Sequence, residues 1–147
     1  MTAGPVVIAY DGSDLAKRAI EQAGRQLGNG RDSLVLTVWQ LVDLGFVPVS
    51  GTEIDAARTD EVRQAAEDTA AEGAALAEAA GFRARSEATE AVPTWRGIVD
   101  FADEHDAGMI VLGSHSRSGL SGVLLGSVSS AVMEHARRPL MIVPPSD

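Results

Sequence analysis

The stretch MIVLGSHSRSGLSGVLLGSVS, residues 109–129, decides the fold of this chain. Residues 109–112 are uncharged and mostly branched, and Gly113 follows at once, which is typical of a strand that is buried on both faces and stops at a loop. The loop is rich in glycine and serine, so its main-chain N–H groups and hydroxyls can approach an anion closely. Gly126 and Ser127 then open a segment with apolar residues at helical spacing. A phosphate group above Ser127 would lie at the positive end of that helix.

Phosphate loops of two other kinds are excluded by the residues. No Gly-Lys-Ser or Gly-Lys-Thr follows Gly113, and the only lysine is Lys17, so the loop is not a P-loop of the ATPase kind. No Gly-x-Gly-x-x-Gly follows a predicted strand, and the second strand ends at Trp39-Gln40 rather than at the acidic residue of a dinucleotide site. These observations argue against a nicotinamide or flavin dehydrogenase. A surface loop without a ligand remains the alternative to a phosphate site.

The spacing of the loop glycines resembles the nucleotide loop of the universal stress protein family. The ATP-binding members of that family carry Gly, two residues, Gly, nine residues, and then Gly-Ser or Gly-Thr. Gly113 and Gly126-Ser127 match this spacing, whereas Ser116 stands at the middle glycine position. A serine there still donates its N–H but disfavours a positive φ. The resemblance extends over nearly the whole chain, including Ala9-Tyr10-Asp11-Gly12-Ser13 and the Arg137-Arg138-Pro139 segment before a last apolar stretch.

The composition indicates one small domain, residues 1–147, without a metal centre or a membrane span. Apolar residues make up 45% of the chain, which is enough for one substantial core. There is no cysteine, and the three histidines lack the close pairing of zinc motifs. The N-terminus has no basic leader, and no run reaches about 18 consecutive apolar residues, so we expect a cytoplasmic protein. The net charge of −9 argues against a nucleic-acid partner.

Strands and helices are expected to alternate, which is the pattern of a parallel sheet covered on both faces. Ser13 is placed to cap the first helix, Gly28 to end it in a left-handed conformation, and Gly81 to end the second helix. The charged strand near residue 85 suits a sheet edge. We expect strands at residues 5–10, 34–39, 82–88, 109–112 and 140–143, and helices after Ser13, from about 54 to 80, from about 94 to 105, and after Gly126. The resemblance implies an α/β fold with a single open five-stranded parallel sheet of order 3-2-1-4-5, adenine nucleotide alpha hydrolase-like, whose winding reverses between the first and fourth strands.

The resemblance also implies a ligand, ATP with Mg²⁺ bound through the phosphates, in the crevice at that reversal. Asp11 either caps the first helix or contacts the nucleoside, and the backbone of Val38 would hold the adenine edge. Arg117 would bridge phosphate oxygens unless it is merely solvated. No second acid or Mg²⁺ carboxylate stands near His115 in the sequence, so we predict binding without fast catalysis. The candidate binding residues are Ala9, Tyr10, Asp11, Val38, Leu112, Gly113, His115, Ser116, Arg117, Gly126, Ser127, Val128 and Ser129.

The function that follows from the resemblance is that of a nucleotide-dependent regulatory protein of the stress response. Family members pair through the last strand, so we expect a homodimer through residues 140–143, unless Pro144 and Pro145 blunt that edge in a monomer. Three alternatives remain open: a nucleotide-free interaction module, a slow ATPase, and a protein that binds AMP or cyclic AMP instead. Ser116 is the residue that separates the first of these from the ATP-binding form.

Overall fold

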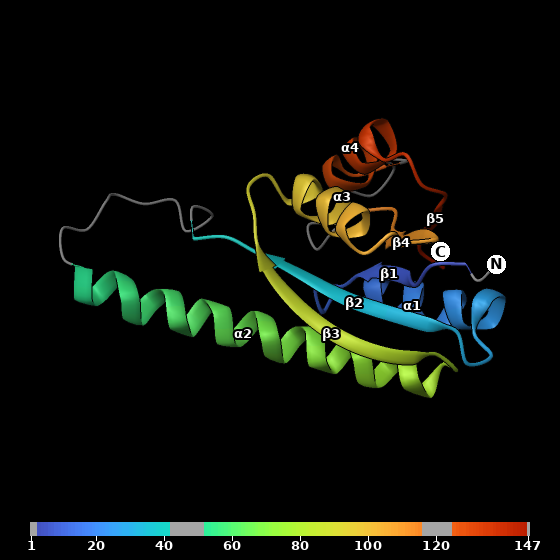
Figure 1. Cartoon of the computed structure of the whole chain (residues 1–147), viewed down its shortest axis with the longest axis horizontal. Coiled ribbons are helices and arrows are strands. Elements are labelled where there is room, and N and C mark those ends of the chain that lie inside the picture. The colour runs from blue at the N-terminus through green and yellow to red at the C-terminus, as the bar shows by residue number, and fades with distance from the viewer. Residues whose placement is uncertain (1–2, 42–51, 116–124, 147) are drawn as a thin grey trace.

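Five parallel strands form one sheet in the order β3-β2-β1-β4-β5 in the computed structural model, which describes residues 3–41, 52–115 and 125–146 (Figure 1). The predicted strand order is therefore confirmed. In the central register, Ile8 lies between Val35 and Val111. The elements are β1 (Val6–Ala9), α1 (Asp14–Leu27), β2 (Asp32–Trp39), α2 (Thr52–Ala79), β3 (Arg83–Glu90), α3 (Thr94–Glu104), β4 (Met109–Gly113), α4 (Ser127–His135) and β5 (Leu140–Val143).

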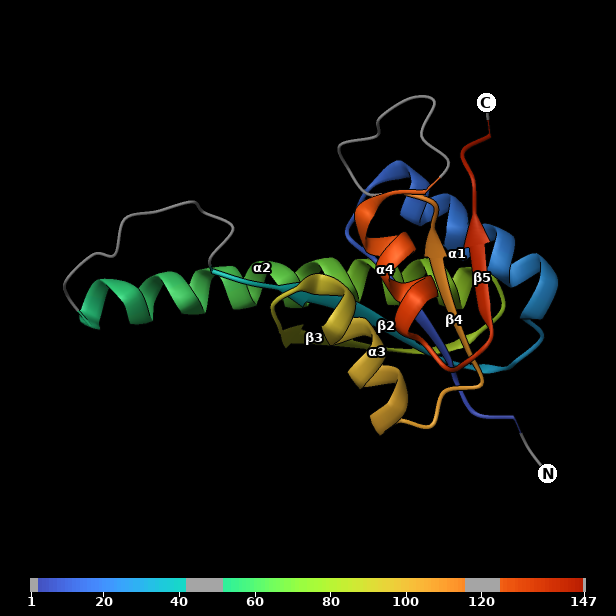
Figure 2. The ribbon, with the colours of Figure 1, turned by 90° about the horizontal axis from the view of Figure 1, so that it is seen from above.

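Helices cover both faces of the sheet, with α1 and α2 on one face and α3 and α4 on the other (Figures 1 and 2). The core is correspondingly divided into two layers. Ile8 and Val35 pack with residues of α1 and α2, whereas Val7 and Leu36 pack with residues of α3 and α4. Successive residues of a strand point to opposite faces, so a strand covered on both sides is apolar throughout. This explains the unbroken apolar runs in the sequence.

The ends of α1 and α2 agree with the predictions made for Ser13 and Gly81 but not with the one made for Gly28. The Ser13 hydroxyl accepts a hydrogen bond from the Ala16 N–H and caps α1, as predicted. Gly81, at φ 111°, takes the left-handed conformation after α2. Gly28 does not, because its φ is −58° and the left-handed residues are the next two along, Asn29 and Gly30. Position 28 favours glycine for a steric reason, because a Cβ there would lie 2.5 Å from a carbonyl oxygen of α1.

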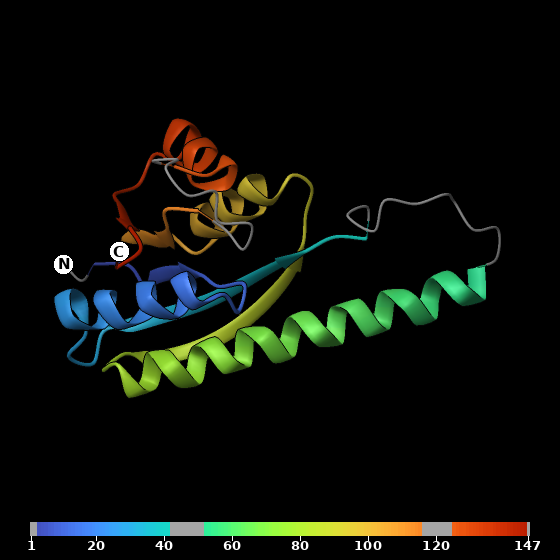
Figure 3. The same cartoon turned by 180° about the vertical axis from the view of Figure 1, so that it is seen from behind.

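The longest helix described, α2, extends at its N-terminal end beyond the carboxyl ends of β2 and β3 (Figure 3). Its C-terminal half packs on the sheet, where buried Gly73 faces Tyr10 and Val35. A Cβ on Gly73 would come within 2.7 Å of both side chains, so glycine permits the close approach of helix and sheet. Across the described residues, no helix combines the length and the apolar character needed to span a membrane.

Candidate functional site

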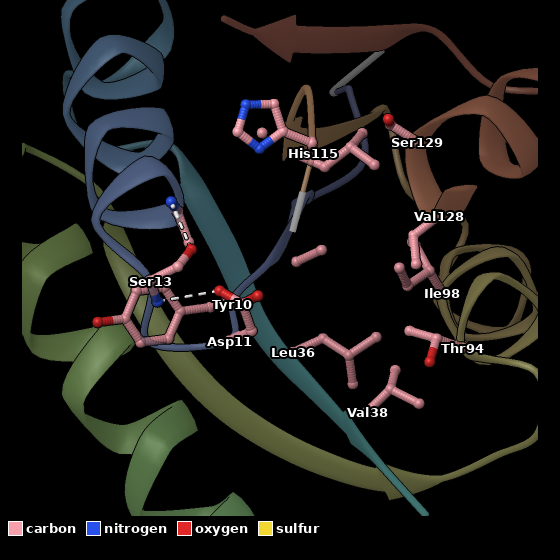
Figure 4. Close-up of a pocket in the computed structure, with 14 residues that line it drawn as sticks. Tyr10, Asp11, Ser13, Leu36, Val38, Thr94, Ile98, His115, Val128 and Ser129 are labelled. Atoms are coloured by element: carbon pink, nitrogen blue, oxygen red, sulfur yellow. Dashed lines mark hydrogen bonds between the residues drawn. The ribbon is translucent and has the colours of Figure 1, made fainter. Parts of the chain in front are cut away.

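A cavity opens at the carboxyl ends of β1 and β4, where the winding of the sheet reverses (Figure 4). In open α/β sheets this is the place where ligands bind. The volume of the cavity is about 100 Å³, well above the roughly 10–15 Å³ that one water molecule needs. The lining residues come from β1, β2, β4, α1, α3 and α4 and from the turns that follow the strands: Ala9, Tyr10, Asp11, Ser13, Ala16, Leu36, Val38, Thr94, Ile98, Leu112, Gly113, His115, Val128 and Ser129.

One end of the cavity is formed by the start of α4, which two serines join to the end of β4. The Ser129 hydroxyl, buried in the protein, donates to the Ser114 carbonyl at 2.5 Å, and the Gly126 N–H donates to the same oxygen at 2.7 Å. The Gly126 N–H also reaches the Ser129 hydroxyl oxygen at 3.1 Å. A Cβ on Gly126 would lie 2.9 Å from Cα and Cβ of His115. This network fixes the N-terminus of α4, the positive end of its dipole, beside the cavity.

The turn after β1 places Asp11 on the lining of the cavity. The Asp11 carboxylate accepts a hydrogen bond from the Ser13 N–H at 3.0 Å, while Ser13 itself caps α1. Gly12 between them has φ 82°, a conformation that favours glycine. The two roles considered for Asp11 are thereby separated, because the helix cap is Ser13 and the carboxylate lines the cavity.

Tyr10 borders the cavity with its backbone, while its ring points away from it toward α2 (Figure 4). The ring is buried, and its hydroxyl donates a hydrogen bond to the Glu72 carboxylate of α2. Burial and, next to it, this hydrogen bond raise the pKa of Tyr10 above its usual range. On the backbone side, the Thr37 hydroxyl donates to the Tyr10 carbonyl at 2.8 Å. Tyr10 is therefore held through both its side chain and its backbone.

The opposite end of the cavity is apolar and lies between β2 and α3. Leu36, Val38 and Ile98 form its walls, and the hydroxyl of Thr94 is the polar group beside them (Figure 4). Thr94 is the first residue of α3, directly after Pro93. An apolar wall interrupted by one hydroxyl is suited to a flat, largely apolar ring.

The structure brings together most, but not all, of the predicted site residues. Gly126 and Ser127 do not line the cavity: Gly126 is the N-cap of α4, and Ser127 is exposed in its first turn. Ser116 and Arg117 lie outside the described residues. The predicted residues that do line it are Ala9, Tyr10, Asp11, Val38, Leu112, Gly113, His115, Val128 and Ser129.

Five lining residues were missed by the sequence reasoning: Ser13, Ala16, Leu36, Thr94 and Ile98. Ser13 was interpreted only as the cap of the first helix. A signal for Thr94 was present, since helices that follow parallel strands begin at the carboxyl edge of the sheet, where Val92-Pro93 introduces α3. Among the described lining residues there is one carboxylate, that of Asp11, and no lysine or arginine.

The sheet order, with a cavity at the reversal of winding, defines an α/β protein of the doubly wound class. The model of the universal stress protein family matches residues 3–144. The chain therefore belongs to the universal stress protein family, which confirms the resemblance drawn from the loop. A universal stress protein of Methanocaldococcus jannaschii is 28% identical over 138 residues, which cover 94% of this chain and 80% of that protein. One of Mycolicibacterium smegmatis is 32% identical over 153 residues and covers 96% of this chain, and the match spans 46% of that longer protein.

Solved structures of the family share the fold over almost the full length. UspA of Lactobacillus plantarum has a TM-score of 0.75 at 20% identity, covering 97% of this chain and 99% of that one. A universal stress protein in complex with cAMP has a TM-score of 0.69 at 25% identity, covering 97% and 98% of the two chains. The universal stress protein of Archaeoglobus fulgidus in complex with dAMP has a TM-score of 0.59 at 25% identity, with the same coverage.

Proposed function

We propose that this chain is an adenine-nucleotide-binding regulatory protein, with ATP as its ligand and no fast catalysis. The observation that carries the proposal is the cavity at the reversal of winding, which is apolar beside Val38 and lies against the start of α4 at its other end. An adenine ring would lie at the apolar end, and the phosphates would lie near the N-terminus of α4. The family structures in complex with cAMP and dAMP support the same class of ligand.

The described part of the cavity fits the nucleoside better than it fits a triphosphate. The carboxylate of Asp11 can accept hydrogen bonds from ribose hydroxyls, but it repels phosphate oxygens. A helix N-terminus contributes only up to about 2 kcal/mol to anion binding, whereas micromolar affinity requires about 8 kcal/mol. Burial of the base at the apolar end must therefore provide much of the binding free energy.

Any Mg²⁺ at this site would be held through the phosphates of the nucleotide. The described residues contain no group of three histidine, aspartate or glutamate side chains that could hold a metal ion. Mg²⁺ commonly keeps several waters and binds through substrate phosphates, so this arrangement requires no protein cage. The ion would then reduce the repulsion between the phosphates and a chain of net charge −9.

The proposal is tested by titration calorimetry on nucleotide-free protein with ATP in the presence and absence of Mg²⁺, and with AMP and cyclic AMP. Replacing Ala9 at the end of β1 with leucine fills the cavity, and we expect Ala9→Leu to weaken binding more than tenfold, about 1.4 kcal/mol. Ala75→Leu, on an exposed position of α2, is the matched control and should bind like the wild type. Wild-type protein that binds none of these nucleotides would instead support the nucleotide-free interaction module.

We also propose that two copies pair through β5 to form the regulatory unit. The described sheet has two edges with opposite character: β3 carries charged, mostly exposed side chains, whereas Leu140–Val143 is wholly apolar and mostly half-buried. An apolar edge strand is a template for pairing with another chain, and charged side chains protect an edge from it. The Arg18 side chain donates to the Pro144 carbonyl at 2.9 Å, which fixes the backbone just beyond β5.

Sedimentation separates this dimer from a monomer. Ile142→Lys in β5 is expected to yield monomers that keep the circular dichroism of the folded protein, because a charge cannot be buried in an apolar strand pair without large cost. Ser86→Lys on the β3 edge is the control and should leave the mass unchanged. A wild-type protein that sediments as a monomer at micromolar concentration would rule out pairing through this edge.

A further inference from the structure

The apolar end of the cavity contains a hydroxyl whose orientation is set by a neighbouring amide. Thr94 lies beside Val38 and Ile98 at this end (Figure 4). Its hydroxyl oxygen accepts a hydrogen bond of 2.8 Å from the side-chain amide of Gln40, the residue directly after β2. The same amide nitrogen donates to the Ala91 carbonyl at 3.0 Å. Gln40 thus ties together the end of β2, the segment before α3 and the first residue of α3.

The hydrogen bonds at Gln40 determine which partner donates. A carbonyl oxygen only accepts, so the contact with Ala91 requires that the NH₂ side of the Gln40 amide faces it. The two hydrogens of that nitrogen then serve Ala91 and the Thr94 oxygen. Among the described residues, Gln40 is the one hydrogen-bond partner of the Thr94 hydroxyl. The hydroxyl hydrogen of Thr94 is therefore available to a ligand, and accepting a bond from Gln40 strengthens it as a donor.

We propose that Thr94 donates a hydrogen bond to a ring nitrogen of the purine base bound in this cavity, and that Gln40 is the positioning residue that keeps Thr94 a donor. This inference rests on the proposed nucleotide function and deepens it, because it assigns base recognition to two residues outside the glycine loop. The ring nitrogens of adenine carry lone pairs at its edge, so a hydroxyl that donates matches them. The apolar side chains of Val38 and Ile98 beside it offer no hydrogen bond that would compete for the edge of the base.

Thr94→Val tests the donor with a change of one atom type at nearly constant shape. The probe is adenosine, which has no phosphates and so reports on the base and ribose alone. A neutral hydrogen bond corresponds to a roughly 2- to 12-fold weaker affinity when it is lost. We expect that loss for Thr94→Val, and recovery of wild-type affinity for Thr94→Ser, which keeps a hydroxyl. Thr69→Val, whose hydroxyl bonds within α2 away from the cavity, is the control for the substitution itself.

Gln40→Glu tests the positioning role because it reverses one hydrogen bond without changing the size of the side chain. A carboxylate cannot donate, so it would take the hydroxyl hydrogen of Thr94 and withdraw it from the base. We expect Gln40→Glu to weaken the binding of adenosine at least as much as Thr94→Val does. In the Thr94→Val background, Gln40→Glu should cost much less, because no hydroxyl remains to be withdrawn. A purely structural role for Gln40 would give equal losses in both backgrounds.

Deaza analogues of adenosine, each with one ring nitrogen replaced by C–H, identify the acceptor. One analogue should bind the wild type roughly 2- to 12-fold more weakly than adenosine does, but should bind Thr94→Val as tightly as adenosine does. If the wild type binds adenosine and Thr94→Val binds it equally well, the inference is overturned and the proposed function stands. If the wild type binds neither adenosine nor AMP or ATP, both the proposed function and the inference are overturned.

Discussion

Tyr10 is the only tyrosine of the chain, and its environment makes a specific prediction about stability at alkaline pH. The ring is buried between the sheet and α2, and its hydroxyl donates to Glu72. Burial, and then the hydrogen bond and the charge of Glu72, raise the pKa of Tyr10 in the folded protein. In the unfolded chain the pKa is close to 10. The folded protein thus keeps a proton that the unfolded chain loses above that pH.

The sign of the effect follows from this difference. The contribution of Tyr10 is fully present below about pH 10 and falls as the pH rises toward the pKa of the folded state, by about 1.4 kcal/mol per pH unit. Between pH 10 and pH 11.5 the free energy of unfolding should therefore drop by about 2 kcal/mol because of this one group. At neutral pH, Tyr10→Phe removes the hydrogen bond to exposed Glu72, at a cost of about 1 kcal/mol. The stability curves of the two proteins should then cross about 0.7 pH units above pH 10.

The assay is denaturant unfolding of the wild type and Tyr10→Phe at a series of pH values, combined with a spectrophotometric titration. Titrations of other groups are shared by both proteins and cancel in the difference. Because there is one tyrosine, the tyrosinate absorbance of the wild type reports Tyr10 alone. We expect this absorbance to rise only well above pH 10, or together with loss of the circular dichroism of the folded state. Tyrosinate formed near pH 10 in protein that is still folded would refute the buried, hydrogen-bonded geometry of Tyr10.

Three further predictions concern packing, and all use equilibrium unfolding with circular dichroism. Ser33 and Ser129 are equally buried, but the Ser33 hydroxyl has no partner among the described residues, whereas the Ser129 hydroxyl is bonded to Ser114 and Gly126. Ser33→Ala should therefore be neutral or stabilising by up to about 1 kcal/mol, and Ser129→Ala should cost about 1–3 kcal/mol. Equal effects of the two changes would contradict the assigned hydrogen bonds. Gly73→Ala should destabilise by about 1 kcal/mol despite the higher helix propensity of alanine, because its Cβ would meet Tyr10 and Val35 at 2.7 Å. The exposed Ala75→Gly measures the propensity term alone, about 1 kcal/mol, and a gain of stability in Gly73→Ala would show that the helix has room.

The sequence predicts the inner strands of the sheet well because they are covered on both faces and carry apolar runs. The apolar run at Met109–Leu112 needs no tertiary information to be identified as a buried strand, and its neighbours follow from the family resemblance. Element boundaries were less accurate. β2 begins two residues earlier than predicted, at Asp32, because that residue pairs with Arg83 of β3 through the strand register and a salt bridge of 3.1 Å. Such a pairing depends on which strands are neighbours.

The cavity was predictable where strands end and less so where helices begin. Asp11, Val38 and Gly113 follow or end parallel strands, and the carboxyl ends of such strands meet at one edge of the sheet. Ile98 reaches the same cavity from within α3, and its inclusion depends on how that helix crosses the sheet. No local pattern encodes that crossing. Ser129 lines the cavity as well, and its hydroxyl also holds α4 to the Ser114 carbonyl.

The residues from Tyr10 to Ser13 serve both the fold and the site, and this overlap determines how site variants must be interpreted. Asp11 lines the cavity and also accepts the Ser13 N–H that shapes the start of α1. Its replacement would change the wall of the cavity and loosen that turn at once, so a lost affinity at this position would not identify its cause. Thr94 lies apart from this turn at the apolar end of the cavity, and Gln40 is bonded to it. If the proposed base recognition holds, substitutions there change the hydrogen bonds offered to the base while Asp11, Ser13 and the cap of α1 stay as they are.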